Sequence, residues 1–97
     1  MLIKPGVDIS RLNRAIRRTL PTLDRIYRDL NSELVITSTY EGTHAPGSLH
    51  YANDAIDIRF PERAYDETID KIKTELGKAY DCLKSPNCIH IEYDPKT

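Results

Sequence analysis

The stretch AIDIRF, residues 55–60, decides the fold of this 97-residue chain. Its side chains alternate, with isoleucine at 56 and 58 and phenylalanine at 60, and with Asp57 and Arg59 between them. A period of two predicts a β-strand that packs one face on an apolar core. Asp57 then lies on the opposite, polar face of the sheet.

A second stretch with the same period, CIHIEY at residues 88–93, lies near the end of the chain. One face of this predicted strand is apolar and the other carries Cys88, His90 and Glu92. A turn through Pro86 and Asn87 joins it to a predicted strand at residues 79–83. The β-branched run ELVITST, residues 33–39, predicts a further strand. Residues 40–49 contain two glycines and a proline and are expected to form a loop.

Residues 8–30 carry the strongest helical pattern, because their apolar residues recur every three or four positions: Ile9, Leu12, Ile16, Leu20, Leu23, Ile26 and Leu30. Asp8 or Ser10 can cap the start of this segment. Pro21 predicts either a kink or two helices that meet near Thr19. A second helix is expected after Pro61, with an apolar stripe that ends at Gly77 and consists of Ala64, Ile69, Ile72 and Leu76.

These elements predict one α+β domain, in which helices pack on the apolar face of a small antiparallel sheet of about four strands. The chain is long enough for a single modest core. Its 14 basic and 15 acidic residues give a net charge of -1, which argues against a nucleic-acid partner. The arginines between positions 11 and 28 are expected to form a solvated helix face, with a partner-binding stripe as the alternative.

No apolar run is long enough for a transmembrane helix, and residues 1–30 lack the pattern of a signal peptide. We therefore expect synthesis in a cytoplasm and no membrane partner. The two cysteines, Cys82 and Cys88, are too few for a disulfide scaffold and are expected to stay reduced. A bridge between them across the intervening turn is the alternative.

Three residues form a candidate metal site: His50 and Asp57 in the segment SLHYANDAID, and His90 in the last strand. Two imidazoles and a carboxylate are the donors of hydrolytic zinc sites, which keep a fourth position open. Each residue also has an ordinary structural interpretation. A histidine is usually a partly buried polar side chain, and Asp57 could pair with Arg59 or Arg63.

The same residues resemble the zinc D-alanyl-D-alanine carboxypeptidase and L-alanyl-D-glutamate endopeptidase group, whose fold is shared by the hedgehog signalling domain. The signature of that group is Ser-x-His-x-x-Gly-x-Ala-x-Asp, and it is matched here by Ser48, His50, Ala55 and Asp57. Asn53 replaces the glycine and tolerates the left-handed backbone conformation that glycine would adopt. His90 corresponds to the ligand that the group carries in a late strand.

The resemblance implies a hedgehog/DD-peptidase-like fold, zinc bound by His50, Asp57 and His90, and a peptidoglycan stem peptide as substrate. Ser48 would support the ligands by a hydrogen bond. A small chain of this kind without an export signal resembles phage or prophage members, which are made in the bacterial cytoplasm and act in the periplasm or with the virion.

The catalytic part of the pattern differs. Active relatives place a general base shortly before the last ligand, where this chain has Ser85 and Cys88. An arginine that the group carries after the first strand is replaced by Glu41. Glu92, Glu41 and His44 are candidate substitutes. Strand geometry favours Glu92, which could instead orient His90.

Cys88 could also close the open metal position as a fourth ligand. The sequence thus leaves two main functions open: a peptidase with reduced or lost activity, and a non-catalytic metal-stabilised binding or phage structural module of the same fold. An unrelated small interaction domain is a third.

Overall fold

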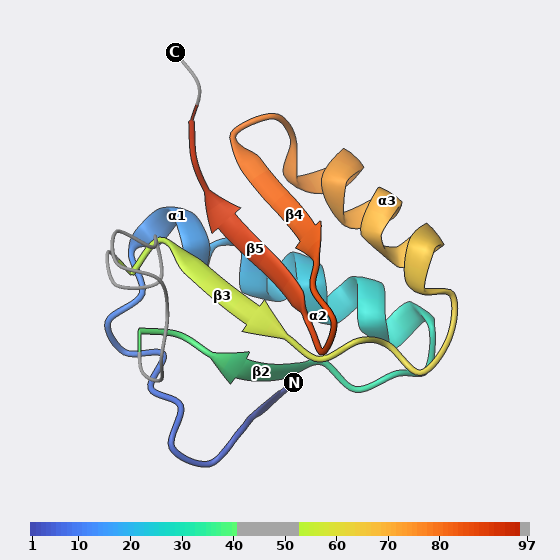
Figure 1. The fold of residues 1–97 in the computed structure, drawn as a ribbon, viewed down its shortest axis with the longest axis horizontal. Coiled ribbons are helices and arrows are strands. Elements are labelled where there is room, and N and C mark those ends of the chain that lie inside the picture. Colours follow the sequence, from blue (N-terminus) through green and yellow to red (C-terminus); the bar gives the residue numbers. More distant parts are fainter. Residues whose placement is uncertain (41–52, 96–97) are drawn as a thin grey trace.

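A computed structural model describes residues 1–40 and 53–95 of the chain, and Figure 1 shows a sheet with helices packed behind it and beside it. The elements in chain order are β1 (Leu2–Ile3), α1 (Arg14–Arg17), α2 (Thr19–Asp29), β2 (Val35–Ser38), β3 (Ala55–Ile58), α3 (Tyr65–Leu76), β4 (Tyr80–Lys84) and β5 (Ile89–Tyr93). The predicted α+β class is confirmed.

The sheet has five strands in the order β1-β2-β3-β5-β4. The pairs β2–β3, β3–β5 and β5–β4 are antiparallel, as predicted, but β1 pairs with β2 in parallel. The sheet is therefore mixed: the four predicted antiparallel strands are present, but the fifth, parallel strand β1 was not predicted. Strand β1 has two residues, too few to produce a recognisable period. Its neighbour Lys4 adds a hydrogen bond of 3.0 Å from its N–H to the Ile36 carbonyl.

The apolar face of the sheet lies against the helices. Ile56, Ile58, Ile89 and Ile91 are fully buried and belong to one core cluster with residues of α1, α2 and α3, among them Ile16, Leu23, Ile26 and Ile72. The alternation predicted for β3 and β5 is thus confirmed. Figure 1 shows α2 behind the sheet and α3 beside β4, so no helix of residues 1–40 and 53–95 covers the opposite face of the central strands.

The first helical segment is divided in two, which is one of the predicted alternatives. Helix α1 ends at Arg17, and α2 begins at Thr19. Pro21 is the third residue of α2, where a backbone N–H has no intrahelical partner to lose. The predicted start of the first helix at Asp8 or Ser10 is wrong, because α1 begins only at Arg14. Asp8 accepts a hydrogen bond of 2.8 Å from the Ser10 N–H and forms a local turn instead of capping a helix. In the described part of the chain, no helix combines the length and apolar character needed to cross a bilayer.

Ala64 does not extend the stripe of α3 as predicted, because it precedes the helix in the left-handed conformation, with φ 56° and ψ 46°. This conformation costs an L-residue about 1–2 kcal/mol, and glycine avoids that cost while losing about 0.5–1 kcal/mol in chain entropy. We expect Ala64→Gly to raise the melting temperature by about 2–8 °C in thermal unfolding.

Ala79→Gly is the matched control, because Ala79 is not among the residues with positive φ. There glycine brings only its entropy cost, and the melting temperature should fall. Equal decreases in the two variants would contradict the strain assigned to Ala64.

Candidate functional site

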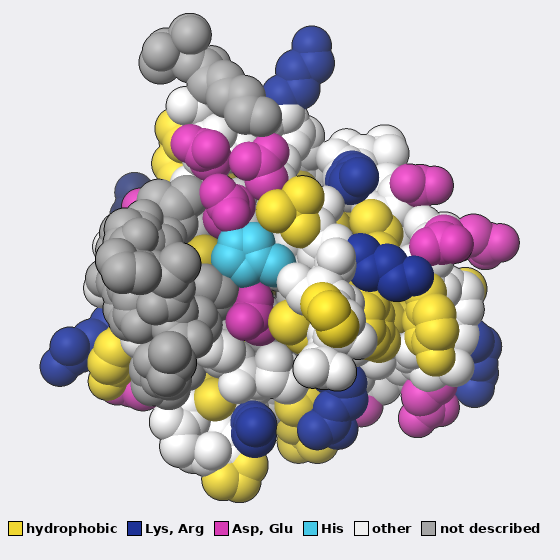
Figure 2. Space-filling model, viewed as in Figure 1, with side chains coloured by type: hydrophobic (Ala, Val, Ile, Leu, Met, Phe, Trp, Pro, Cys, Tyr) yellow, Lys and Arg dark blue, Asp and Glu magenta, His cyan; other side chains and the backbone are white. Residues whose placement is uncertain are grey.

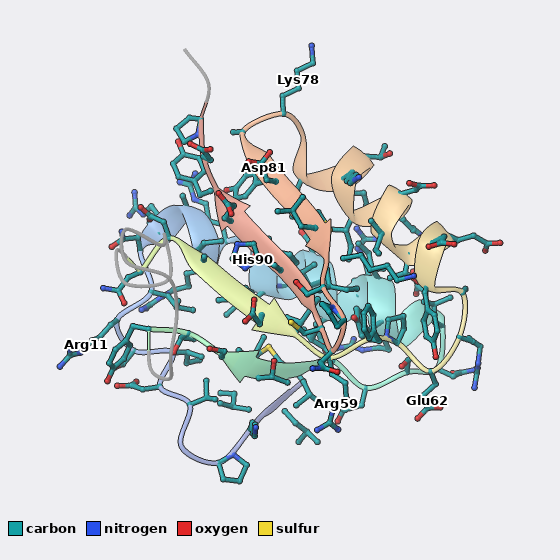
Figure 3. All side chains as sticks on the ribbon, in the orientation of Figure 1. Arg11, Arg59, Glu62, Lys78, Asp81 and His90 are labelled. Carbon is teal, nitrogen blue, oxygen red and sulfur yellow. The ribbon has the colours of Figure 1, made fainter. Side chains whose placement is uncertain are left out.

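Asp57 and His90 meet on the polar face of the sheet. They are directly opposite each other in the antiparallel register of β3 and β5. The Asp57 Oδ1 atom is 2.9 Å from the Nδ1 atom of His90, and each side chain is 17% exposed. Figure 3 shows His90 at the centre of the sheet, and Figure 2 shows the imidazole between acidic side chains on this face. The contact joins two strands that are far apart in sequence.

The strand pairing explains this contact. Directly opposite residues of an antiparallel pair carry their side chains on the same face, about 4.5–5.5 Å apart at Cβ. Because Ile56, Ile58, Ile89 and Ile91 all point into the core, Asp57 and His90 both point out of it. The predicted common face of the two residues is confirmed. Arg63, one alternative partner of Asp57, instead donates a hydrogen bond of 3.0 Å to the Leu30 carbonyl.

Glu92 contacts the other nitrogen of the same imidazole. Its Oε1 atom lies 2.7 Å from His90 Nε2, and its side chain is 18% exposed. The hydrogen bond with Asp57 is the largest influence on His90 and raises the pKa of the imidazole; burial acts in the opposite direction, and the bond with Glu92 raises it further. The two carboxylates therefore favour a protonated imidazole, and a metal ion bound at His90 must displace a proton.

Two further carboxylates lie in this region and were not predicted from the sequence. Asp81 on β4 and Asp94 after β5 have oxygen atoms that, with one from Glu92, lie within 4.8 Å of one another. Asp81 and Glu92 are directly opposite in the β4–β5 register. Asp81 lies four residues before Ser85 and Glu92 four residues after Cys88, so in a hairpin with its turn at residues 85–88 the two are opposite each other. This equal spacing could have predicted the pair from the sequence. Such a cluster suits hard cations, although acidic groups also gather on protein surfaces without one.

Four predicted residues lie outside the described residues: the ligand His50, Ser48, and the candidate bases Glu41 and His44. The structure therefore brings together two of the three predicted zinc ligands, Asp57 and His90, and their assignment to zinc stays a prediction.

Asn53, which replaces the glycine of the signature, has the backbone conformation predicted for it. Asn53 has a φ of 63°, in the left-handed region expected for a residue that replaces glycine. It leads into β3, and its carbonyl accepts a hydrogen bond of 3.0 Å from the Asn13 N–H. The start of β3 is thus joined to the residue that precedes α1.

Ser85 and Cys88, the positions where the resemblance would place a general base, lie in the turn between β4 and β5. The Ser85 N–H donates a hydrogen bond of 2.9 Å to the Cys88 carbonyl. Burial, and next the negative charge of Asp57, raise the pKa of the Cys88 thiol, so it is a poor base at neutral pH.

Cys82 and Cys88 are both free, so the alternative of a bridge across the turn is wrong. Cys82 is opposite Ile91 and is buried in the core, where burial raises the pKa of its thiol to about 11. Cys88 precedes β5 in phase with His90, on the polar side. Alternation along the strands thus places the two thiols on opposite faces of the sheet.

Comparison of the chain with protein families, curated proteins and solved structures finds no match. The resemblance to the zinc peptidase group therefore depends on the motif residues themselves.

Proposed function

We propose that the chain is a zinc-binding domain of the peptidoglycan peptidase type, with the hedgehog/DD-peptidase fold and with His50, Asp57 and His90 as ligands. The observation that carries this proposal is the contact between Asp57 and His90 on the polar face of the sheet. The proposed substrate is a peptidoglycan stem peptide.

The described donors fit zinc. One imidazole nitrogen and one carboxylate oxygen are adjacent and mostly buried, and both are ligand types that zinc accepts. Glu92 contacts the second imidazole nitrogen, as carboxylates commonly do behind histidine ligands, where they hold the ring orientation and the tautomer. When bound, zinc would act as a Lewis acid on a peptide carbonyl and lower the pKa of a water molecule.

The position of Glu92 supports an orienting role more than a role as general base. Asp57 contacts Nδ1 of His90, and Glu92 contacts Nε2. If zinc is bound by Nδ1 together with Asp57, the Nε2–H group still donates its hydrogen bond to Glu92. Catalysis by Glu92 itself stays a prediction. With a protonated thiol at Cys88 and a hydroxyl at Ser85, these positions supply no efficient base, which favours slow hydrolysis or a non-catalytic module.

The proposal is tested by muropeptide release from purified peptidoglycan. We expect the parent chain to be slower than active relatives by a factor of about a hundred to ten thousand, because it lacks a positioned base. The double variant Ser85→Glu with Cys88→His should raise the rate without a large change in zinc affinity. Rapid release by the parent chain would contradict the reduced-activity part of the proposal.

Glu92→Gln separates the two roles of that residue in the same assay. If Glu92 orients His90, its loss should weaken zinc binding about 10–100-fold, and excess zinc should restore any residual rate. If Glu92 is the base, the rate should disappear even at saturating zinc. Zinc affinity is measured independently with a competing chelator.

A further inference from the structure

A groove of about 700 Å³ lies at α1 and is lined by Leu12, Asn13, Arg14, Arg17 and Arg18. Its volume is within the range of small-molecule binding sites. Among the lining residues that the structure describes, three carry guanidinium groups and none carries a carboxylate. The groove lies in the helical layer, because Ile16 of α1 packs into the core beneath the sheet. It is therefore separate from His90, which lies on the other face.

Helical spacing explains why the guanidinium groups gather. Arg17 and Arg18 follow Arg14 by three and four positions, which places all three on one side of the helical segment. Like charges at this spacing destabilise a helix. In residues 1–40 and 53–95, no carboxylate forms an ion pair with any of the three. By contrast, Arg25 and Arg28 on α2 pair with Glu75 and Asp24.

Two neighbouring side chains define the groove further. Arg11, labelled in Figure 3, does not line the groove and lies over the Tyr40 ring at 4.8 Å from its centre. The nearby carboxylate of Asp54 accepts a hydrogen bond of 2.7 Å from the Asn13 side-chain amide. The carboxylate that is hydrogen-bonded to the groove residue Asn13 thus contacts an amide and not one of the three arginines.

Arg17 is held in place before any ligand arrives. Its Nη2 atom donates to the carbonyls of Ser10 at 3.0 Å, Leu12 at 3.2 Å and Ile9 at 3.5 Å. In the part of the chain that is described, no hydrogen bond uses its Nε or Nη1 atoms. A fixed guanidinium loses little conformational entropy when its remaining N–H groups bind an anion.

We propose that this groove binds a small molecule that carries a diphosphate group. Guanidinium groups donate paired, charge-assisted hydrogen bonds to phosphate oxygens. Three of them match a multiply charged anion better than a single carboxylate, and the groove has more room than one phosphate fills. Leu12 adds an apolar contact for the organic part of the ligand. The nearly neutral chain and the confinement of this charge to one groove favour a small ligand over a nucleic acid.

The test is titration with sodium pyrophosphate, followed by isothermal calorimetry and by NMR of the ¹⁵N-labelled chain. We expect saturable binding, with resonance shifts for the amides of residues 12–18 and for the Arg17 Nε–H group. Arg14→Gln and Arg18→Gln should each weaken binding about tenfold, since each removes a pair of charge-assisted hydrogen bonds. Arg17 is left unchanged because its loss would also release the carbonyls that it holds.

Arg28→Gln is the matched control, because it removes one positive charge from the ion-paired α2 surface and should leave the affinity unchanged. Citrate, a carboxylate anion, should bind more weakly than pyrophosphate. The proposal is overturned if binding does not saturate at millimolar pyrophosphate, if Arg28→Gln weakens it equally, or if citrate binds as tightly. Shifts confined to residues 55–58 and His90 would place the anion at the other face and also overturn it. The proposed zinc site is not required for any of these results.

Discussion

His90→Ala and Asp57→Ala are each expected to remove zinc from the purified chain and to lower its melting temperature. Removing either donor leaves an incomplete ligand set. A ligand present at 100 to 1,000 times its dissociation constant stabilises a folded chain by about 2.7–4.1 kcal/mol, and in a domain of this size that loss corresponds to about 10–30 °C. Elemental analysis and differential scanning calorimetry measure the two effects.

Scans with a chelator separate the stability that comes from zinc from the stability that comes from the hydrogen bonds of His90. His90→Ala also removes the contacts with Asp57 and Glu92, so some stability is lost even without zinc. The decrease that depends on zinc is the difference between scans with and without chelator. This difference should be large for the parent chain and absent for both variants. Full zinc occupancy in both variants would contradict the ligand assignment.

Asp81→Asn is the control that distinguishes the two groups of carboxylates. Asp81 belongs to the acidic cluster with Glu92 and Asp94 and is not a proposed zinc ligand. We expect this variant to keep its zinc and most of its melting temperature. If Asp81→Asn loses the metal while Asp57→Ala retains it, the acidic cluster is the metal site and the proposed one is wrong.

Tyr27→Ala is expected to cost about 3–5 kcal/mol of unfolding free energy, a large part of the 5–15 kcal/mol of a typical domain. Tyr27 is fully buried and belongs to the core cluster. Its hydroxyl donates a hydrogen bond of 2.5 Å to the Arg59 carbonyl, which ties α2 to the end of β3. Urea unfolding measures the free energy.

Two further variants divide this effect. Tyr27→Phe keeps the ring and leaves the Arg59 carbonyl without the hydroxyl, so it should cost about 1–3 kcal/mol. Tyr65→Ala removes an aromatic ring that is 46% exposed and touches Phe60, and it should cost less than Tyr27→Ala. A Tyr27→Ala variant as stable as Tyr65→Ala would show that Tyr27 does not support the core as the structure indicates.

Local patterns were enough to predict the polar and apolar faces of the two central strands. The alternation around Asp57 and around His90 depends only on neighbouring residues, because successive side chains of a strand point to opposite sides. The division of the first helical segment near Pro21 and the left-handed conformation of Asn53 are local in the same sense. Each follows from the shape of one residue and its own backbone.

Helix capping and core membership required more than local patterns. Asp8 can cap a helix or close a turn with Ser10, and both use the same carboxylate, so the surrounding chain decides between them. Tyr27 follows Leu23 by four positions and so shares the apolar face of residues 8–30, but its hydroxyl also needs a partner when the ring is buried. The tertiary structure supplies that partner, because the carbonyl of Arg59, which follows β3, accepts its hydrogen bond. The parallel pairing of β1 is also not local, because β1 pairs with the side of β2 that is not occupied by β3.

The sequence by itself determined which side chains share a face: Asp57 on one strand, and His90 with Glu92 on the other. Only the tertiary structure decided that Asp57 contacts Nδ1 of His90, that Glu92 contacts Nε2, and that Asp81 joins the carboxylates. These contacts depend on β5 lying between β3 and β4, although α3 and β4 separate β3 from β5 along the chain. Pairing between distant strands is set by the packing of the whole core, which a local period of two does not encode.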